Sequence, residues 1–370
     1  MGWKSCEEDK VKILILANND VGLYKFRRAL LLELLRKGNK VVISLPYGEF
    51  VDDLISDGCE FINTPVDRRG INPITDIKLL NQYKKIIKKI QPDFVITYTI
   101  KPNVYGGMIC RWVKKPYAIN ITGLGTAFQK KGILRKIVVS MYKIACKNAK
   151  VIFFENEENR QLFIKERISD DSQTYRLNGA GVDLKEYKLK EYPTGEKIKF
   201  LFIGRVMEEK GINELFDAMK RLIDDNKVCE LDVVGGYEED YREKIEQYQK
   251  EGWLHYCGYQ KDVKPFIEKC HCFVLPSWHE GMANTNLECA ATGRPIITTD
   301  IPGCKEAVVN ESSGILVEKQ NSIDLYNKMN QFIGMTYEGK KRMGLEGRKL
   351  MEKNFDKKNV VYETINMIFK

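Results

Sequence analysis

The 370-residue chain is long enough for two domains, and its 43% hydrophobic and 30% charged residues are ordinary for a soluble globular protein with a net charge of +9. No apolar stretch reaches the roughly 18 residues that a membrane-spanning helix needs, and the polar, mixed-charge start predicts no secretory signal. Ten cysteines without a regular spacing indicate a reducing cytoplasm and exclude a disulfide framework.

Short apolar runs alternate with helical patterns along the first half of the chain. Strands are predicted at residues 12–17, 41–45, 60–63, 93–97, 117–121 and 151–154. Helices are predicted between them, at about 24–36, 52–57, 76–90, 105–113 and 134–148. Buried strands that alternate with helices form a parallel sheet covered on both faces.

The same alternation restarts after a polar segment. Strands are predicted at residues 199–203, 230–234, 273–275, 295–298 and 314–317, with helices at about 212–224, 238–251 and 283–292. We therefore expect an α/β protein with an N-terminal domain over 1–182, a linker over 183–197 and a C-terminal domain over 198–355. A last helix over 356–370 could pack back on the first domain. Two doubly wound parallel-sheet domains would face a central cleft at the carboxyl ends of their strands.

Two carboxylates stand eight residues apart, at Glu280 and Glu288, in the segment 277–288. The segment follows an apolar strand, and its second half has the pattern of a helix that ends at Gly293. Exposed amides at a helix start attract anions, so the pair suits a ligand with sugar hydroxyls and phosphates. Each glutamate by itself is equally typical of a solvated helix surface.

A second loop carries two cations. Gly204 permits a tight turn after the strand 199–203, Arg205 offers a fork of donors, and Lys210 adds a point charge before the next helix. Such a pair is suited to a diphosphate leaving group. By itself the loop is also typical of exposed charged surface.

Together these motifs resemble the donor site of the family-4 retaining glycosyltransferases, which have the two-domain GT-B architecture. The resemblance implies that Arg205 and Lys210 bind the donor diphosphate, that Glu280 faces the donor sugar and that Glu288 holds the ribose hydroxyls. It also implies donor contacts at Gly204, Gly22, Tyr259 and the amides of Gly281, Met282 and Ala283.

Segments of the first half, 20–27, 70–73, 121–125 and 178–183, are similar to a subgroup that acts on bacterial surface glycans. Its best-known relatives add N-acetylgalactosamine to a sugar on undecaprenyl diphosphate. The resemblance implies acceptor-side roles for Asn19, Asp20, Tyr24, Thr122, Gly123 and Asn178. Thr122 stands where many family members have a histidine. Asp20 is equally suited to cap the following helix.

The resemblance implies transfer with retention, with the departing phosphate taking the acceptor's proton. Arg205, Lys210 and Glu280 would be the catalytic residues, since stabilising the growing phosphate charge is the largest contribution in such sites. No Asp-x-Asp sequence occurs in the chain. We expect no metal and no cofactor apart from a nucleotide-sugar donor, and we expect that donor to be UDP-linked.

Positive charge is concentrated in the first half. Residues 1–190 hold 34 basic and 21 acidic side chains, and no acidic residue occurs between Asp93 and Glu155. The helix near 134–148 combines bases with apolar residues, which is typical of contact with an anionic membrane and also of a solvated face over a core helix. We expect residues 101–150 to bind the inner face of the plasma membrane from the cytoplasm, where a polyprenyl-diphosphate-linked saccharide would be the acceptor.

Two other functions fit parts of the chain. A sugar-nucleotide epimerase shares the two-domain architecture, but the chain has only three histidines and none lies in the first half. A nucleic-acid-binding protein would explain the basic half, but aromatic residues are not interleaved with the bases in an RNA-binding pattern. The donor sugar, the acceptor, the linkage and the oligomeric state stay open.

Overall fold

The computed structural model describes residues 10–67, 72–124, 128 and 132–370. Contacts divide the chain into one unit of Met1–Ala180 with Val360–Lys370 and a second unit of Gly181–Asn359. The segment 183–197, expected to be a linker, is therefore part of the second unit, and most of the last helix groups with the first. Predictions that concern Gly70, Gly125, Lys130 and Lys131 lie outside the described residues.

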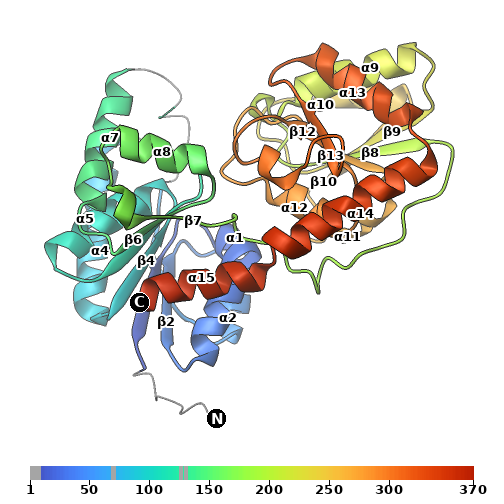
Figure 1. The fold of residues 1–370 in the computed structure, drawn as a ribbon. Coiled ribbons are helices and arrows are strands. Elements are labelled where there is room, and N and C mark those ends of the chain that lie inside the picture. The colour runs from blue at the N-terminus through green and yellow to red at the C-terminus, as the bar shows by residue number, and fades with distance from the viewer. Residues whose placement is uncertain (1–9, 68–71, 125–127, 129–131) are drawn as a thin grey trace, which may run out of the picture. The chain divides into compact units, whose positions relative to one another are not determined.

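The first unit is built on a parallel sheet (Figure 1). Its strands are β1 Lys12–Leu16, β2 Lys40–Leu45, β3 Glu60–Asn63, β4 Phe94–Tyr98, β5 Tyr117–Ile121, β6 Val151–Phe154 and β7 Thr174–Arg176. Its helices are α1 Asp20–Gly22, η1 Leu23–Arg27, α2 Arg28–Arg36, α3 Val51–Ser56, α4 Pro73–Ile90, η2 Pro102–Gly106, α5 Gly107–Trp112, α7 Ile133–Cys146, α8 Glu157–Lys165, η3 Asp171–Gln173 and α15 Lys357–Phe369. Among the described residues the sheet has seven strands in the order β3-β2-β1-β4-β5-β6-β7.

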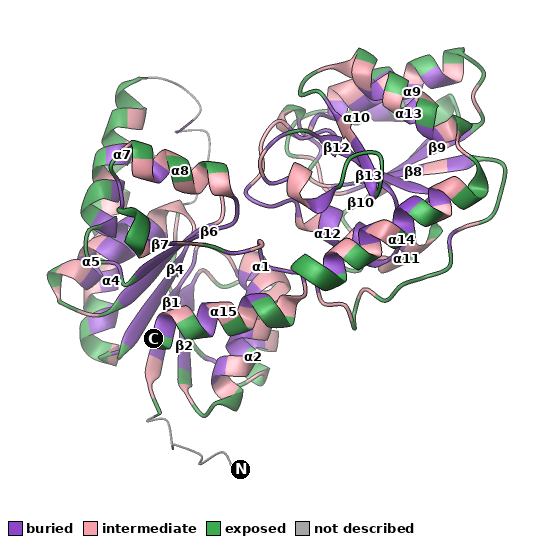
Figure 2. Ribbon diagram, viewed as in Figure 1, coloured by how far each residue is buried: buried purple, intermediate pink, exposed green. Residues whose placement is uncertain are grey.

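Helices cover both faces of this sheet because its strands are apolar on both sides (Figure 2). One core joins the strands to α4, α5 and α7, and the other joins them to α2, α3 and α15. The last helix contributes Val360, Ile365 and Ile368 to the second of these cores. The doubly wound arrangement confirms the predicted fold class for this unit.

The second unit repeats the plan around six described strands in the order β10-β9-β8-β11-β12-β13, all parallel. The strands are β8 Ile198–Ile203, β9 Cys229–Val234, β10 Leu254–Gly258, β11 Cys272–Leu275, β12 Ile296–Thr299 and β13 Gly314–Val317. The helices are η4 Glu208–Lys210, α9 Ile212–Asp224, α10 Arg242–Lys250, α11 Lys264–Lys269, α12 Asn284–Ala291, η5 Lys305–Ala307, α13 Ser322–Gly334 and α14 Tyr337–Asn354. One apolar core joins them.

Most predicted strands agree with the structure to within one or two residues. The helix expected over 24–36 instead begins with α1 and the π-helix η1, and the helix expected over 105–113 begins with the π-helix η2. The helices α8, α11, α13 and α14 and the strands β7 and β10 were not anticipated. Among the described helices, none is long and apolar enough to cross a membrane.

Candidate active site

The strand order of the second unit changes direction between β8 and β11, which are neighbours in the sheet. In parallel sheets a ligand binds outside the carboxyl ends of strands at such a point. Gly204 and Arg205 follow β8, and the segment with Glu280 follows β11. The two motifs that stood out in the sequence are therefore brought to one edge of one sheet.

Lys210 and Glu280 are in direct contact, although 70 residues separate them in the chain. The ammonium group of Lys210 forms an ion pair with Glu280 Oε1, and the two side chains are only 19% and 13% exposed. Ser277 Oγ donates a hydrogen bond of 2.8 Å to the same carboxylate oxygen. A half-buried cation is thus held at the switch point by a carboxylate whose own position is fixed.

A close backbone approach places Lys210 there. Gly211 has a left-handed φ of 72°, and a Cβ on it would lie 2.0 Å from the carbonyl oxygen of Pro276. A side chain is therefore excluded by both conformation and space. The amide of Trp278 donates to Glu209 O at 3.0 Å, so the loops after β8 and β11 are bound to each other.

Arg205 takes a different partner. Its guanidinium lies 3.2 Å from Glu238 in the loop after β9, and half of its side chain is exposed. Gly235 in that loop packs against Gly204, since a Cβ on Gly235 would lie 1.8 Å from Gly204 O. Arg205 is thus at the same sheet edge as Lys210, with its charge engaged by Glu238.

The segment from Gly281 to Ala283 makes more contacts within the protein than the sequence predicted. The amide of Ala283 donates to Gly303 O at 2.7 Å, and the side chains of Met282 and Ala283 are buried in the core. The expectation that all three amides contact a sugar phosphate needs correction at Ala283, because its donor already has a partner. Asn284, at the start of α12, keeps a buried Oδ1 without a hydrogen-bond partner among the described residues.

Glu288 is the fifth residue of α12, and after burial its charge is the main cause that raises the pKa of Tyr187. Tyr259 is exposed and follows β10 at the same carboxyl edge, after Gly258 with its left-handed φ of 65°. The predicted donor residues of the second unit therefore all lie in loops or helix turns that follow β8, β10 and β11.

His279 and Trp278 were not predicted as site residues. Trp278 Nε1 donates to Glu214 at 3.0 Å, and His279 Nε2 lies 3.4 Å from Glu209. Burial lowers the pKa of His279, against the opposite effect of the nearby Glu209 carboxylate. Trp278 thus links the Glu280 loop to α9, and His279 links it to the η4 turn. Only their position directly before Glu280 could have drawn notice to them.

The predicted acceptor-side residues lie at the carboxyl edge of the first unit's sheet. Asn19, not Asp20, caps α1, because its Oδ1 accepts from the Gly22 amide at 2.7 Å. Asp20 is buried and accepts from the Phe50 amide at 2.8 Å. The capping alternative for Asp20 is therefore wrong, and the amide of Gly22 is already engaged.

The other acceptor-side residues follow different strands. Tyr24 is stacked on Phe50 with ring centroids 4.6 Å apart. Thr122 and Gly123 follow β5, and Asn178 follows β7. Since β4 separates β1 from β5 in the sheet, the loops of Asn19 and Thr122 are not carried by neighbouring strands.

Sequence reasoning missed a polar cluster at the switch point of the first unit, between β1 and β4. Arg27 and Glu155 form a buried ion pair, and the guanidinium lies 5.1 Å from the Tyr98 ring centroid. Thr99 has a φ of 74°, which is rare for a β-branched residue and is typical of functional sites. A buried arginine has no distinct sequence pattern, so only the structure could reveal the cluster.

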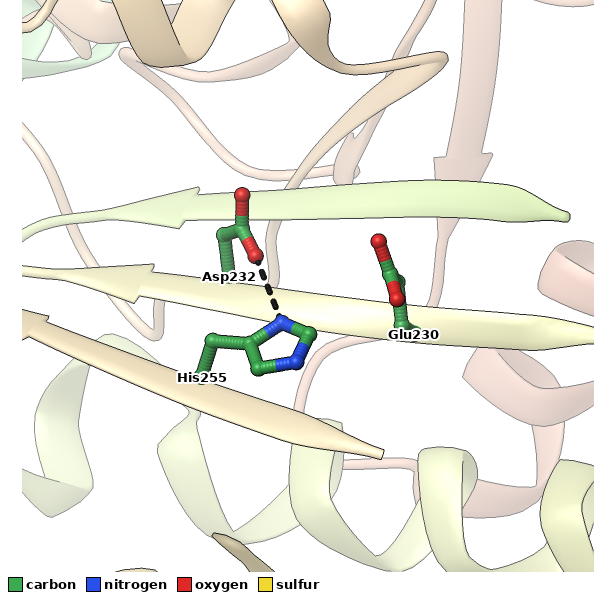
Figure 3. A group of neighbouring side chains, drawn as sticks. All are labelled: Glu230, Asp232 and His255. Atoms are coloured by element: carbon green, nitrogen blue, oxygen red, sulfur yellow. Dashed lines mark hydrogen bonds and ion pairs between the residues drawn. The ribbon is translucent and has the colours of Figure 1, made fainter. Parts of the chain in front are cut away.

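Within the described residues, one group of side chains has ligand atoms close enough together to hold a metal ion: Glu230, Asp232 and His255. Figure 3 shows the imidazole of His255 turned toward Asp232, at 3.1 Å, with Glu230 beside them. Lys197 and Lys199 already form ion pairs with Glu230 at 2.6 and 2.9 Å. These carboxylates are thus neutralised, and they lie on the strands rather than in the loops of the candidate active site.

Comparison with known proteins matches each of the two units to a glycosyltransferase family model. A family model described as Glycosyl transferase 4-like matches residues 12–156, and one described as Glycosyl transferases group 1 matches residues 185–350. A Campylobacter jejuni N,N'-diacetylbacillosaminyl-diphospho-undecaprenol alpha-1,3-N-acetylgalactosaminyltransferase is 26% identical over 337 residues, which cover 86% of this chain and 88% of that protein. An Escherichia coli UDP-Gal:alpha-D-GlcNAc-diphosphoundecaprenol alpha-1,3-galactosyltransferase is 29% identical over 74% of each chain.

Solved structures share the fold along the whole chain. An Anabaena protein, HepE, crystallised with UDP and glucose, has a TM-score of 0.81 at 16% identity and covers 97% of this chain and 99% of its own. A glycosyltransferase from Rickettsia africae has a TM-score of 0.78 at 17% identity, with 98% of each chain covered. Because the two family models together match well over half of the 370 residues, the chain belongs to the glycosyltransferases, with a 4-like segment followed by a group 1 segment.

Proposed function

We propose that this glycosyltransferase moves a hexose or N-acetylhexosamine, with retention, from a UDP-sugar to a saccharide on a polyprenyl diphosphate in bacterial capsule, O-antigen or glycoprotein glycan synthesis. The observation that carries the proposal is the Lys210–Glu280 contact at the switch point of the second sheet. Two relatives named for transfer to diphosphoundecaprenol-linked sugars support the acceptor. The matched relatives are transferases, which favours transfer over epimerisation.

The reaction breaks the bond between the anomeric carbon and the phosphate oxygen, and its electron pair stays on the leaving UDP. The acceptor oxygen then bonds to the same carbon on the same face, and its proton passes to the departing phosphate. Lys210 and Arg205 would stabilise the charge that grows on the diphosphate, which is where a preformed cation accelerates a reaction most. Glu280 would hold Lys210 in place and accept a hydrogen bond from a sugar hydroxyl.

Two protein cations supply the charge that a metal would otherwise provide, and we therefore propose that transfer is metal-independent. A screen of UDP- and GDP-sugars for hydrolysis, followed by transfer to a lipid-linked acceptor, tests the function. Activity with a UDP-sugar should persist in excess EDTA. Activity restored only by a divalent cation would contradict the metal-independent reaction.

Arg205→Ala should raise KM for the donor about tenfold or more, since charge-assisted hydrogen bonds to phosphate are worth about 1.5–3 kcal/mol. Steady-state kinetics with varied donor concentration measures the effect. Arg342→Ala, which removes an exposed arginine of α14, is the matched control and should behave as wild type. An Arg205→Ala enzyme with undiminished transfer would remove Arg205 from the donor site.

The outward face of α7 supports a role at the membrane surface. Ile133, Leu134, Ile137 and Ile144 are exposed on it, and Ile133 is 79% exposed. Lys136 and Lys143 are on the same helix, while Val139 and Tyr142 pack into the core. Exposed isoleucines beside lysines suit insertion into an anionic bilayer, where each base adds about 1 kcal/mol.

The double variant Ile133→Glu/Ile137→Glu should bind vesicles of phosphatidylglycerol and phosphatidylcholine at least tenfold more weakly than wild type, because two apolar anchors become anions. Co-sedimentation at low and high salt measures this, and wild-type binding should weaken as salt screens the lysines. The control is Ile323→Glu, since Ile323 is 55% exposed on α13 of the second unit. Equal binding by the double variant, or no wild-type binding at low salt, would contradict the membrane role.

A further inference from the structure

The outward face of α4 is divided into an apolar part and a basic part. Ile74 and Ile77, near the start of the helix, are 65% and 60% exposed although both side chains are large and apolar. Residues seven or eleven positions apart lie on the same side of a helix, so Lys84 and Lys88 continue the line of Ile77, and Lys85 continues that of Ile74. Apolar residues and lysines along one exposed side are typical of a helix that lies at a membrane surface.

The charge of this surface is almost entirely positive. Asp76 is the one acidic residue in the sequence of α4, and it forms an ion pair with Lys101 at 2.7 Å in which both side chains are largely buried. Between Asp93 and Glu155, the stretch that contains α5 and α7, the sequence has no acidic residue. A partner with complementary charge is therefore anionic.

Trp112, the last residue of α5, extends the same surface toward α7. Its indole is 68% exposed, and the Lys84 ammonium lies 4.3 Å from the centroid of its ring. The neighbouring Arg111 donates a hydrogen bond to Ile144 O of α7 at 3.2 Å. The three helices pack around one core on the same face of the sheet (Figure 1). An exposed indole is favoured at a membrane interface, where its apolar ring is covered and its N–H stays hydrated.

We propose that Trp112 and the exposed face of α4 form a second contact with the anionic membrane, beside that of α7. The indole lies at the level of the lipid headgroups, Ile74 and Ile77 reach the acyl boundary, and the lysines of α4 bind lipid phosphates. The inference rests on the proposed membrane role of α7 and extends it to a lipid-facing layer of three helices. Apolar side chains that stand singly among lysines suit an anionic lipid surface rather than a protein partner.

Fluorescence quenching tests the position of Trp112. The probe is a vesicle of phosphatidylglycerol and phosphatidylcholine with bromine on the acyl chains near the headgroups, because bromine quenches an indole only on close contact. Bound wild type should be dimmer on these vesicles than on unbrominated ones. Trp112→Phe should still bind, since the lysines are unchanged, and should lose this difference. The other three tryptophans are the same in both proteins, so the comparison reports Trp112 alone.

Binding is tested by two double variants that are matched in charge. Ile77→Glu/Trp112→Glu should bind the unbrominated vesicles about tenfold more weakly or worse, because two apolar anchors become anions. Val228→Glu/Val309→Glu is the control. It adds the same two charges to the second unit, at positions that are 61% and 51% exposed, and it should bind almost as well as wild type. All four positions are exposed, so thermal unfolding should be close to that of wild type.

The outcomes separate this contact from that of α7. Vesicle binding by wild type with no quenching of Trp112, or with equal quenching in Trp112→Phe, would overturn the inference and leave the role of α7 intact. Failure of wild type to bind at low salt would remove both. If Ile77→Glu/Trp112→Glu binds vesicles as wild type does but loses a dimer that wild type forms in analytical ultracentrifugation, the face is an interface between copies of the chain, and the inference fails.

Discussion

Lys210→Ala is expected to lower kcat by about 10²–10³, the loss typical of removing one preformed group that stabilises transition-state charge. This corresponds to about 2.7–4 kcal/mol of transition-state stabilisation. Lys210 is the half-buried cation at the switch point of the second unit, where a phosphate charge would be poorly screened by water. Single-turnover transfer from a UDP-sugar measures the chemical step apart from product release.

Glu280→Gln should have a comparable effect, because the two side chains act as a pair. The glutamine can still accept the Ser277 hydrogen bond but no longer balances the Lys210 charge. The double variant Lys210→Ala/Glu280→Gln should therefore lose less than the sum of the single losses, as expected for residues in contact. Urea unfolding of each ligand-free variant separates a catalytic loss from a loss of folding.

Additive single losses would mean that Lys210 and Glu280 act independently and that their contact in the ligand-free protein has no functional weight. Undiminished transfer by Glu280→Gln would remove Glu280 from the site. Lys210→Arg is the conservative variant. It keeps the charge but changes its shape, so it should recover part of the rate.

Much of the fold could be predicted because parallel strands that are buried on both faces appear in the sequence as short, continuously apolar runs. Runs such as residues 12–16 and 151–154 are continuously apolar, and each becomes a strand. The helix starts were harder, since the π-helices η1 and η2 follow from packing against the strand ends and leave no mark in hydrophobic periodicity. The single helix expected over 24–36 accordingly merged two elements, η1 and α2.

The residue types of the candidate site could be predicted, but their pairings could not. In the sequence, Arg205 and Lys210 are simply two cations of one loop. In the structure, Arg205 forms an ion pair with Glu238, whereas Lys210 forms one with Glu280. Partners 33 or 70 residues apart are chosen by sheet topology, and local patterns carry no information about that choice.

Acid should destabilise the second unit through His271, which lies at the turn between α11 and β11. His271 is 6% exposed and lies between two fully buried cysteines, Cys270 and Cys272. Its Nδ1 accepts from the Lys199 amide at 3.0 Å, while its Nε2 has no partner among the described residues. Burial, followed by the Lys340, Arg294 and Lys199 charges, lowers the pKa of His271 to about 4, against a small opposing effect of Glu230.

The direction of the pH effect follows from which state binds the proton. The unfolded histidine titrates near 6.5, so between about pH 6.5 and pH 4 the unfolded chain takes up a proton that the folded chain refuses. The free energy of unfolding of the second unit is therefore not reduced by His271 above about pH 6.5, and it falls as the pH is lowered from there. The largest loss is about 3 kcal/mol, reached near pH 4.

His271→Asn should remove this loss, because asparagine offers an oxygen to the Lys199 amide and has no proton to gain. The variant should be less stable than wild type at pH 7.5, since the edge contact between His271 and Tyr192, with centroids 5.8 Å apart, is lost. Between pH 6.5 and 4.5 its stability should fall less steeply, by up to about 1.4 kcal/mol per pH unit. Amide hydrogen exchange of β8 and β11, corrected for the intrinsic rate, measures the opening free energy at each pH.

Lys340→Met tests independently whether nearby positive charge lowers the pKa of His271. It removes the positive charge that, after burial, lowers the pKa of His271 most, and it keeps an apolar side chain. The loss of stability in acid should therefore become smaller. If the opening free energy falls equally with pH in wild type and His271→Asn, His271 does not titrate in this range. The loss of stability in acid would then arise from protonation of carboxylates. A shallower dependence of stability on pH for both variants would identify one buried imidazole as a main source of acid instability in the second unit.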